Sequence, residues 1–242
     1  MNLVIDIGNT RIKAALFQNN QIVGFEIYNS EQDLFNDTKF ISQAQHAIIG
    51  SVINDLDVFY TNLNSIIPTL VFNVDTKIPI TNLYQTAATL GSDRLAASIG
   101  AYFLHPNNNV LVIDAGTCIK YNFTNFENQY LGGGISPGIQ MKFKALHQFT
   151  SKLPLVRPLN NDVDLIGANT ESSILSGVLN GSLTEIDGII NQYKSCYHDL
   201  ICILTGGDSE YLAKRLKNSI FTHQNLVLKG LNDILNYNLE NN

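Results

Sequence analysis

The chain has 242 residues, of which 45% are apolar and 15% are charged, and its formal net charge is −6. This composition allows a buried core in one large or two small domains, and it excludes a disordered chain. The sequence contains no basic run, which argues against nucleic acid as the main partner. No segment approaches the roughly 18 apolar residues of a membrane span. The three cysteines lack CxxC spacing, which fits a reducing cytoplasm and no zinc site.

Strands and helices alternate along the first half of the chain. The apolar spacing predicts strands at 2–6, 12–17, 22–27, 47–52 and 69–72, and helices at 31–41, 55–65 and 86–104. Pro106 ends the last of these helices, and Pro and Asn crowd together at 106–109. We therefore expect an N-terminal domain over 1–107 and a C-terminal domain over 108–242.

The second half opens with the same pattern as the first. Segments 3–10 and 110–117 each hold an apolar strand, then Asp-x-Gly, then a hydroxyl residue. Further strands are predicted at 119–123, 130–134 and 201–204. Self-similarity over this range predicts an α/β protein of two duplicated domains, with a ligand in the cleft between them.

Each Asp-x-Gly turn can bind both a cation and a phosphate. The carboxylates of Asp6 and Asp114 suit hydrated Mg²⁺ or another cation, and Gly8 and Gly116 let backbone N–H groups approach a phosphate. Lys13 could add a positive point charge. Two such turns facing each other would clamp a nucleoside triphosphate, although the chain has neither a Walker P-loop nor GxGxxG. An aspartate that only forms a turn is the alternative.

A third carboxylate stands in the segment 91–94, at the predicted start of a helix. Asp93 is either a helix cap or a general base, and Arg94 beside it can bind a substrate carboxylate through two hydrogen bonds. The glycine-rich segment 132–138 and the segment 205–208 each follow a strand. Both suit close approach of a ligand to the backbone, and both equally suit simple chain reversal.

Together these motifs resemble the type III pantothenate kinases of the acetate and sugar kinase/actin superfamily, and the resemblance runs nearly end to end. It implies two duplicated actin-like (ribonuclease H-like) domains with a central nucleotide cleft. The motifs that carry it, in chain order, are Asp6–Thr10 with Lys13, Gly91–Arg94, Asp114–Thr117, Gly132–Gly138, Asn169-Thr170 with Gly177, and Thr205–Gly207.

The resemblance implies ATP-dependent phosphorylation of pantothenate to 4′-phosphopantothenate, the first step of coenzyme A biosynthesis. It implies a cytoplasmic homodimer that uses ATP with Mg²⁺ and a monovalent cation, K⁺ or NH₄⁺. Asp93 would accept the proton and Asp114 would hold the monovalent cation. The residues implied to bind ATP are Asp6, Ile7, Gly8, Asn9, Thr10, Arg11, Ile12, Lys13 and Thr117. The residues implied to bind pantothenate are Tyr84, Gly91, Ser92, Asp93, Arg94 and Thr170.

The chain departs from the family pattern at two places. Ala87 stands where the family commonly has a proline, and Cys118, Ile119 and Lys120 replace small and hydroxyl residues. A lysine so close to Asp114 could compete with a monovalent cation. We expect Lys120 to point away from Asp114, and an ammonium found on that carboxylate would remove the cation assignment.

Two other functions remain open. One is a non-catalytic regulator of the same fold that binds a nucleotide or metabolite, and the other is a different small-molecule kinase of the superfamily. The presence of Asp6, Lys13, Asp93, Arg94 and Asp114 favours catalysis, because a binding module need not keep a general base.

Overall fold

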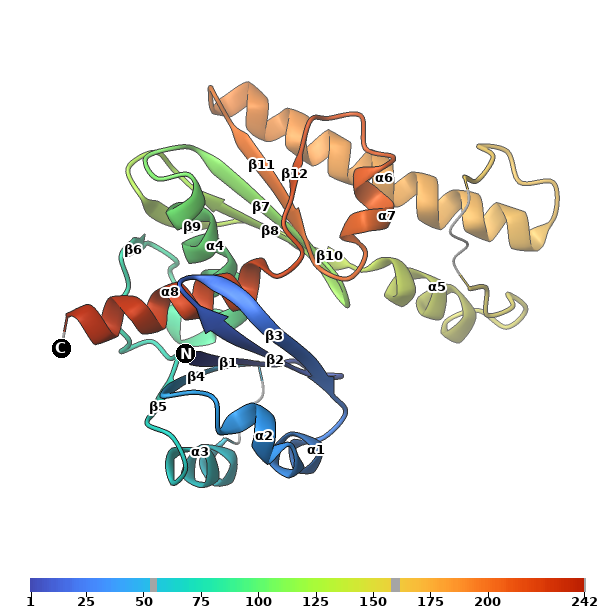
Figure 1. The fold of residues 1–242 in the computed structure, drawn as a ribbon. Coiled ribbons are helices and arrows are strands. Elements are labelled where there is room, and N and C mark those ends of the chain that lie inside the picture. The colour runs from blue at the N-terminus through green and yellow to red at the C-terminus, as the bar shows by residue number, and fades with distance from the viewer. Residues whose placement is uncertain (53–55, 158–161, 242) are drawn as a thin grey trace. The chain divides into compact units, whose positions relative to one another are not determined.

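The computed structural model describes residues 1–52, 56–157 and 162–241, and it divides into two compact units (Figure 1). The first unit comprises Met1–Asn107, Glu127–Leu131 and the residues from Asn225 on. The second comprises Asn108–Phe126 and Gly132–Gln224. A break after residue 107 was expected. The assignment of all of 108–242 to a second domain is wrong.

The sheet of the first unit has the strand order β3-β2-β1-β4-β5. Neighbours in β3-β2-β1 are antiparallel, whereas β4 is parallel to both β1 and β5. Parallel pairing brings the carboxyl ends of β1 and β4 to one edge of the sheet. The bounds are β1 Asn2–Ile7, β2 Ile12–Gln18, β3 Gln21–Tyr28, β4 His46–Ser51 and β5 Thr69–Val71.

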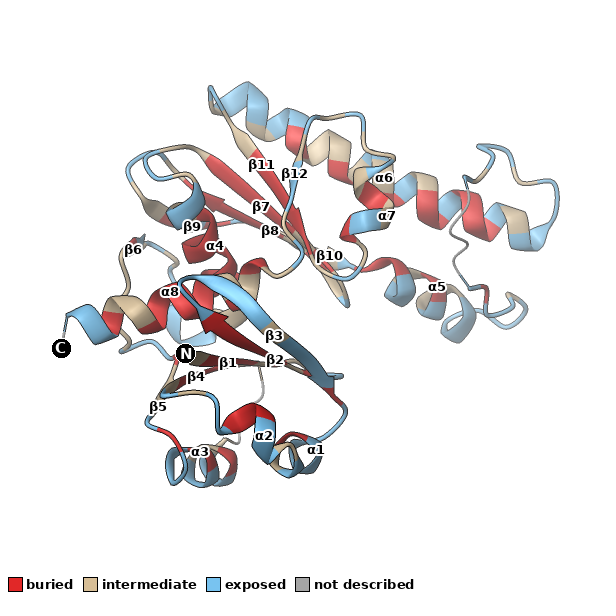
Figure 2. Cartoon of the chain, in the orientation of Figure 1, coloured by how far each residue is buried: buried red, intermediate tan, exposed pale blue. Residues whose placement is uncertain are grey.

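Helices cover both faces of this sheet because alternate strand residues point to opposite faces. Leu3 and Ile5 pack with the apolar residues of α1, α2 and α3, whereas Val4 and Ile48 pack with those of α4 and α8. Figure 2 shows the buried residues along β1, β2 and α8. The bounds are α1 Glu31–Asn36, α2 Thr38–Ile41, α3 Asp57–Asn64, α4 Ser92–Leu104 and α8 Leu226–Glu240.

Two predicted helices differ from the structure. The helix expected at 31–41 breaks at Asp37, whose side chain accepts a hydrogen bond from the amide of Phe40 and so starts α2. The helix expected at 86–104 begins only at Ser92, because Leu90 is extended after a short 3₁₀ turn at Ala87–Thr89. The start expected at residue 55 lies outside the described residues.

The contact between α4 and α8 explains why the end of the chain belongs to the first unit. Gly100 and Gly230 face the opposite helix backbone, and a Cβ on Gly230 would lie 1.8 Å from the carbonyl oxygen of Ala96. Only glycine permits this approach. The chain also returns to the first unit at Glu127–Leu131. There β9 (Gln129–Gly132) pairs in parallel with β6 (Thr81–Asn82).

The sheet of the second unit has the order β12-β11-β7-β8, with β10 paired to β8. Its core packs one sheet face against residues of α5, α6 and α7. The strand expected at 130–134 ends early, because Gly133 has φ +147° and its Cβ would meet the carbonyl oxygen of Tyr121 at 2.0 Å. The bounds are β7 Val110–Ala115, β8 Cys118–Thr124, β10 Ile135–Pro137, α5 Ile139–Gln148, α6 Thr170–Cys196, β11 Ile201–Thr205, α7 Ser209–Ala213 and β12 Phe221–Thr222.

Among the described residues, none of the helices has both the length and the apolar character that crossing a membrane requires.

Candidate active site

Each unit contains one antiparallel hairpin that starts from an Asp-x-Gly strand end. In the first unit, β1 and β2 place Asp6 directly opposite Lys13. In the second unit, β7 and β8 place Asp114 directly opposite Lys120. Residues 8–11 connect the last paired positions of the first hairpin and residues 116–118 those of the second, so the second connection is one residue shorter. The repeat that the sequence shows is therefore a repeat of structure, and it includes a lysine across from each aspartate.

The loop of the first hairpin leaves its polar groups open to solvent. The amide of Gly8 donates to the carbonyl oxygen of Arg11 at 3.1 Å and closes the turn. Asn9, Thr10 and Arg11 are exposed, whereas Lys13 is half-buried. An exposed loop of this kind can present backbone N–H groups, hydroxyl groups and cationic side chains to an anionic ligand.

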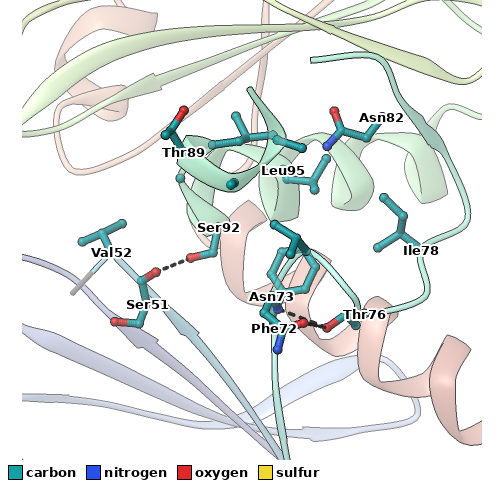
Figure 3. A pocket seen from close by; sticks show the side chains of 15 residues that line it. Ser51, Val52, Phe72, Asn73, Thr76, Ile78, Asn82, Thr89, Ser92 and Leu95 are labelled. Carbon is teal, nitrogen blue, oxygen red and sulfur yellow. Dashed lines mark hydrogen bonds between the residues drawn. The ribbon is translucent and has the colours of Figure 1, made fainter. Parts of the chain in front are cut away.

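The N-terminus of α4 is fastened to the same edge of the sheet. The hydroxyl of Ser92 donates to the carbonyl oxygen of Ser51 at 2.7 Å (Figure 3). Ser51 ends β4 and is the register partner of Ile7 on β1. The first turn of α4, including Asp93, is therefore held beside the strand end that carries Asp6.

Asp93 and Arg94 occupy different environments although they are neighbours. Asp93 is half-buried, and its Oδ1 accepts a hydrogen bond from the amide of Arg94 at 2.8 Å. The positive end of the helix dipole favours a carboxylate there. Arg94 is only 5% exposed, and its guanidinium carbon lies 5.5 Å from the ring centre of Tyr84. The structure thus brings together two residues, Tyr84 and Arg94, that the sequence analysis assigned to one ligand.

A cavity of about 700 Å³ opens beside Gly91 and Ser92 (Figure 3). Its wall mixes apolar side chains with a few polar groups, the usual lining of a small-molecule site. Most residues of this wall belong to no sequence motif, and they were not predicted from the sequence. Ala87 is part of it, at the position where a proline was expected. The other lining residues are Ser51, Val52, Phe72, Asn73, Val74, Thr76, Ile78, Asn82, Ala88, Thr89, Leu90 and Leu95.

In the second unit, the expectation that Lys120 points away from Asp114 is wrong. The Lys120 Nζ lies 3.1 Å from Asp114 Oδ2, and the two side chains are 22% and 14% exposed. Residues directly opposite each other in an antiparallel pair project from the same face, so the register permits this contact. By the criterion stated above, Asp114 is no longer assigned to a monovalent cation.

Gly206 in the segment 205–208 is needed for backbone conformation. Gly206 has φ +94°, and a Cβ on it would lie 2.6 Å from Asp114 Oδ1 and 2.3 Å from the Ala115 carbonyl oxygen. The amide of Asp208 donates to that same carbonyl oxygen at 3.0 Å. This turn therefore packs directly on the Asp114 strand end, and burial raises the pKa of Asp208.

A polar cluster around Glu185 on α6 was not foreseen from the sequence. Its carboxylate accepts hydrogen bonds from Lys142 at 2.7 Å, from Tyr121 at 3.1 Å and from Ser136. Burial alone would raise the pKa of Glu185, but the hydrogen bonds from Lys142 and Ser136 outweigh it and hold the pKa below its ordinary value. The cluster joins the glycine-rich segment, through Ser136, to α5 and α6.

Two predicted site residues of the second unit lie at exposed positions. Thr117 is in the loop between β7 and β8. Thr170 is the first residue of α6, where Asn169 caps the helix and forms a capping box with Ser172. Their predicted contacts with ATP and pantothenate stay predictions.

Known proteins similar to this chain agree on one family. The family model described as type III pantothenate kinase matches residues 2–192. A type III pantothenate kinase of Christiangramia forsetii is 44% identical over 98% of this chain and 99% of its own. One from Bacteroides fragilis is 45% identical over 98% of both chains.

Solved structures with the same fold are more distant in sequence. A Baf family transcriptional activator from Campylobacter jejuni covers 98% of this chain and 99% of its own, with a TM-score of 0.67 and 21% identity. A glucokinase from an Antarctic psychrotroph covers 98% of both chains, with a TM-score of 0.53 and 13% identity. These structures support the fold that the sequence analysis expected.

Proposed function

The chain belongs to the type III pantothenate kinase family, and from this premise we propose that it transfers a phosphoryl group from ATP to pantothenate. It is a kinase, its product is 4′-phosphopantothenate, and the reaction is the first step of coenzyme A biosynthesis. The observation that carries the proposal is the Ser92–Ser51 hydrogen bond, because it fastens Asp93 at the strand edge where the Asp6 loop begins.

Phosphoryl transfer requires little covalent chemistry from the protein and much positioning. We propose that Asp93 orients the pantothenate hydroxyl and accepts its proton as the oxygen bonds to phosphorus. Arg94, with Tyr84, would bind the pantothenate carboxylate beside it. Lys13 and the backbone amides of the 8–11 loop would offset negative charge on the phosphates.

The residues fit a magnesium ion that ATP brings with it. Among the described residues there is no group of three or more His, Cys, Asp or Glu that could hold a metal on its own. Mg²⁺ commonly keeps several waters and binds one or two carboxylates plus substrate phosphates, so the single carboxylate of Asp6 suits it. When bound, the ion would neutralise charge on the phosphate oxygens.

The remaining proposals concern assembly and location. We propose a homodimer in the cytoplasm, which the family resemblance supports. Cys118, Cys196 and Cys202 are all free thiols, as a reducing compartment favours. Size-exclusion chromatography with light scattering would measure the mass of the assembly.

A coupled assay of ADP release with a panel of acceptors tests the function. Turnover of pantothenate is the expected result, turnover of a sugar alone would point to another kinase, and no turnover of any acceptor would point to a regulator. Asp93→Asn should lower kcat by roughly 10²- to 10⁴-fold, the usual contribution of a general base, while ATP binding stays near normal. An unchanged kcat would refute the role of Asp93.

A further inference from the structure

The carboxylate of Asp114 already has a cationic partner within its own hairpin. Lys120 Nζ lies 3.1 Å from Oδ2, and both side chains are mostly buried. The other oxygen, Oδ1, lies against the backbone of Gly206, where even a Cβ would come within 2.6 Å. Both carboxylate oxygens are therefore closely approached by the protein itself.

A lysine stands opposite the aspartate in both of the repeated hairpins. Asp6 faces Lys13 across the first hairpin as Asp114 faces Lys120 across the second, although the two loops differ by one residue. The position of Lys120 is fixed by strand register, since shifting the register by one residue would send its side chain to the other face of the sheet. The register therefore places Lys120 on the same face of the sheet as Asp114.

We propose that the Lys120 ammonium takes the place of a monovalent cation at Asp114, so that this kinase works without K⁺ or NH₄⁺. The inference rests on the proposed function for the reaction concerned. An ammonium carries the same single positive charge as either ion, and it satisfies the carboxylate with a charge-assisted hydrogen bond. The strand end therefore presents no uncompensated negative charge to an incoming polyphosphate.

Because the ammonium is covalently attached, its local concentration does not depend on the solution. A dissolved K⁺ would have to displace Lys120 from Asp114 and leave a half-buried ammonium without this partner. The ion pair within the hairpin therefore favours the tethered cation over a dissolved one.

The first measurement is the rate of pantothenate phosphorylation by the full chain in chloride salts of Na⁺, choline, K⁺ and NH₄⁺ at equal ionic strength. We expect the wild-type rates to agree within about twofold. Each salt screens charge equally, and Lys120 already holds the position at Asp114 that a dissolved cation would take. A wild-type enzyme that K⁺ or NH₄⁺ activates by about tenfold or more over Na⁺ would overturn the proposal.

The second measurement removes the tethered charge. Lys120→Ala should lose about tenfold or more in rate in Na⁺ or choline, and K⁺ or NH₄⁺ should restore most of it. Lys120→Met removes the same charge but fills the space, so these ions should not restore its rate. Lys214→Met is the control for a lost lysine, because Lys214 pairs with Glu210 on an exposed surface. A Lys120→Ala enzyme that is fully active in Na⁺, or inactive and unrestored, contradicts the proposal.

Thermal unfolding gives a readout that does not depend on activity. K⁺ should raise the Tm of Lys120→Ala above its value in equal Na⁺, because an ion that binds only the native state stabilises it, and it should leave the wild-type Tm unchanged. A K⁺-specific rise in the wild type would refute the inference. If no salt supports pantothenate turnover, the proposed function fails, while these Tm values still decide the role of Lys120. If Lys120→Ala does not fold, the wild-type salt comparison decides it.

Discussion

The contact between α4 and α8 allows a quantitative test of the packing that positions Asp93. In Gly230→Ala, the added Cβ would lie 1.8 Å from the carbonyl oxygen of Ala96, whereas real Cβ atoms essentially never come closer than 3.0 Å to another heavy atom. The helices must therefore separate locally by about 3.0 − 1.8 = 1.2 Å. The obstructing atom belongs to a helix backbone, so no side-chain rotation relieves the contact.

The expected loss of stability follows from two opposing terms. Overpacking of this kind costs up to about 3 kcal/mol, and replacing glycine by alanine within a helix returns about 1 kcal/mol. The net loss is about 2 kcal/mol, which corresponds to a fall in Tm of roughly 4–8 °C for a chain of this length. Because α4 begins with the Ser92–Arg94 turn, kcat should fall as well, even at temperatures where the variant stays folded.

Thermal unfolding followed by circular dichroism measures the change. Gly181→Ala is a matched control on α6, because a Cβ at position 181 would meet no atom within 4 Å. That control should gain up to about 1 kcal/mol from helix propensity alone. A Gly230→Ala protein that melts at or above the wild-type temperature would show that the two helices are not in the close contact described here.

Two further predictions concern charged side chains. Arg94→Ala should raise the KM for pantothenate far more than the KM for ATP. Arg94→Lys should restore pantothenate binding only in part, because a lysine lacks the planar guanidinium that forms two parallel hydrogen bonds. Steady-state kinetics measures both KM values, and a selective loss of ATP affinity would contradict the prediction. Glu185→Gln should change how stability depends on pH. The pKa of Glu185 is held below its ordinary 4.5 by Lys142 and Ser136, so its stabilising contribution is fully present above pH 4.5 and is lost as the pH falls below that value. Urea unfolding of the wild type and Glu185→Gln should therefore give free energies that converge at acid pH, and a pH-independent difference would exclude the cluster as the cause.

The sequence predicted those structural features that depend on interactions between residues close together in the chain. Apolar runs that end in Asp-x-Gly predicted both hairpins, because strand periodicity and turn chemistry act over a few residues. The Gly91–Arg94 segment could likewise be assigned to a helix N-terminus. These local signals identified Asp6, Asp93 and Asp114 before any geometry was known.

Contacts between distant segments could not be predicted in the same way. The approach of Gly230 to Ala96 depends on two helices more than a hundred residues apart, and single glycines in a helix look like weak points rather than contacts. The side of the strand on which Lys120 stands depends on loop length as well as on alternation. The strand register that places Lys120 directly opposite Asp114 was not predicted from the sequence.

The place of α8 in the chain has a consequence for biosynthesis. The second unit is built from residues 108–126 and 132–224, all of which leave the ribosome before Leu226–Glu240. The N-terminal sheet, although made first, has only α4 on one apolar face and lacks α8 there until the whole second unit has been synthesised. Nascent chains should therefore acquire protease resistance in the later half before the earlier one, the reverse of the usual vectorial order.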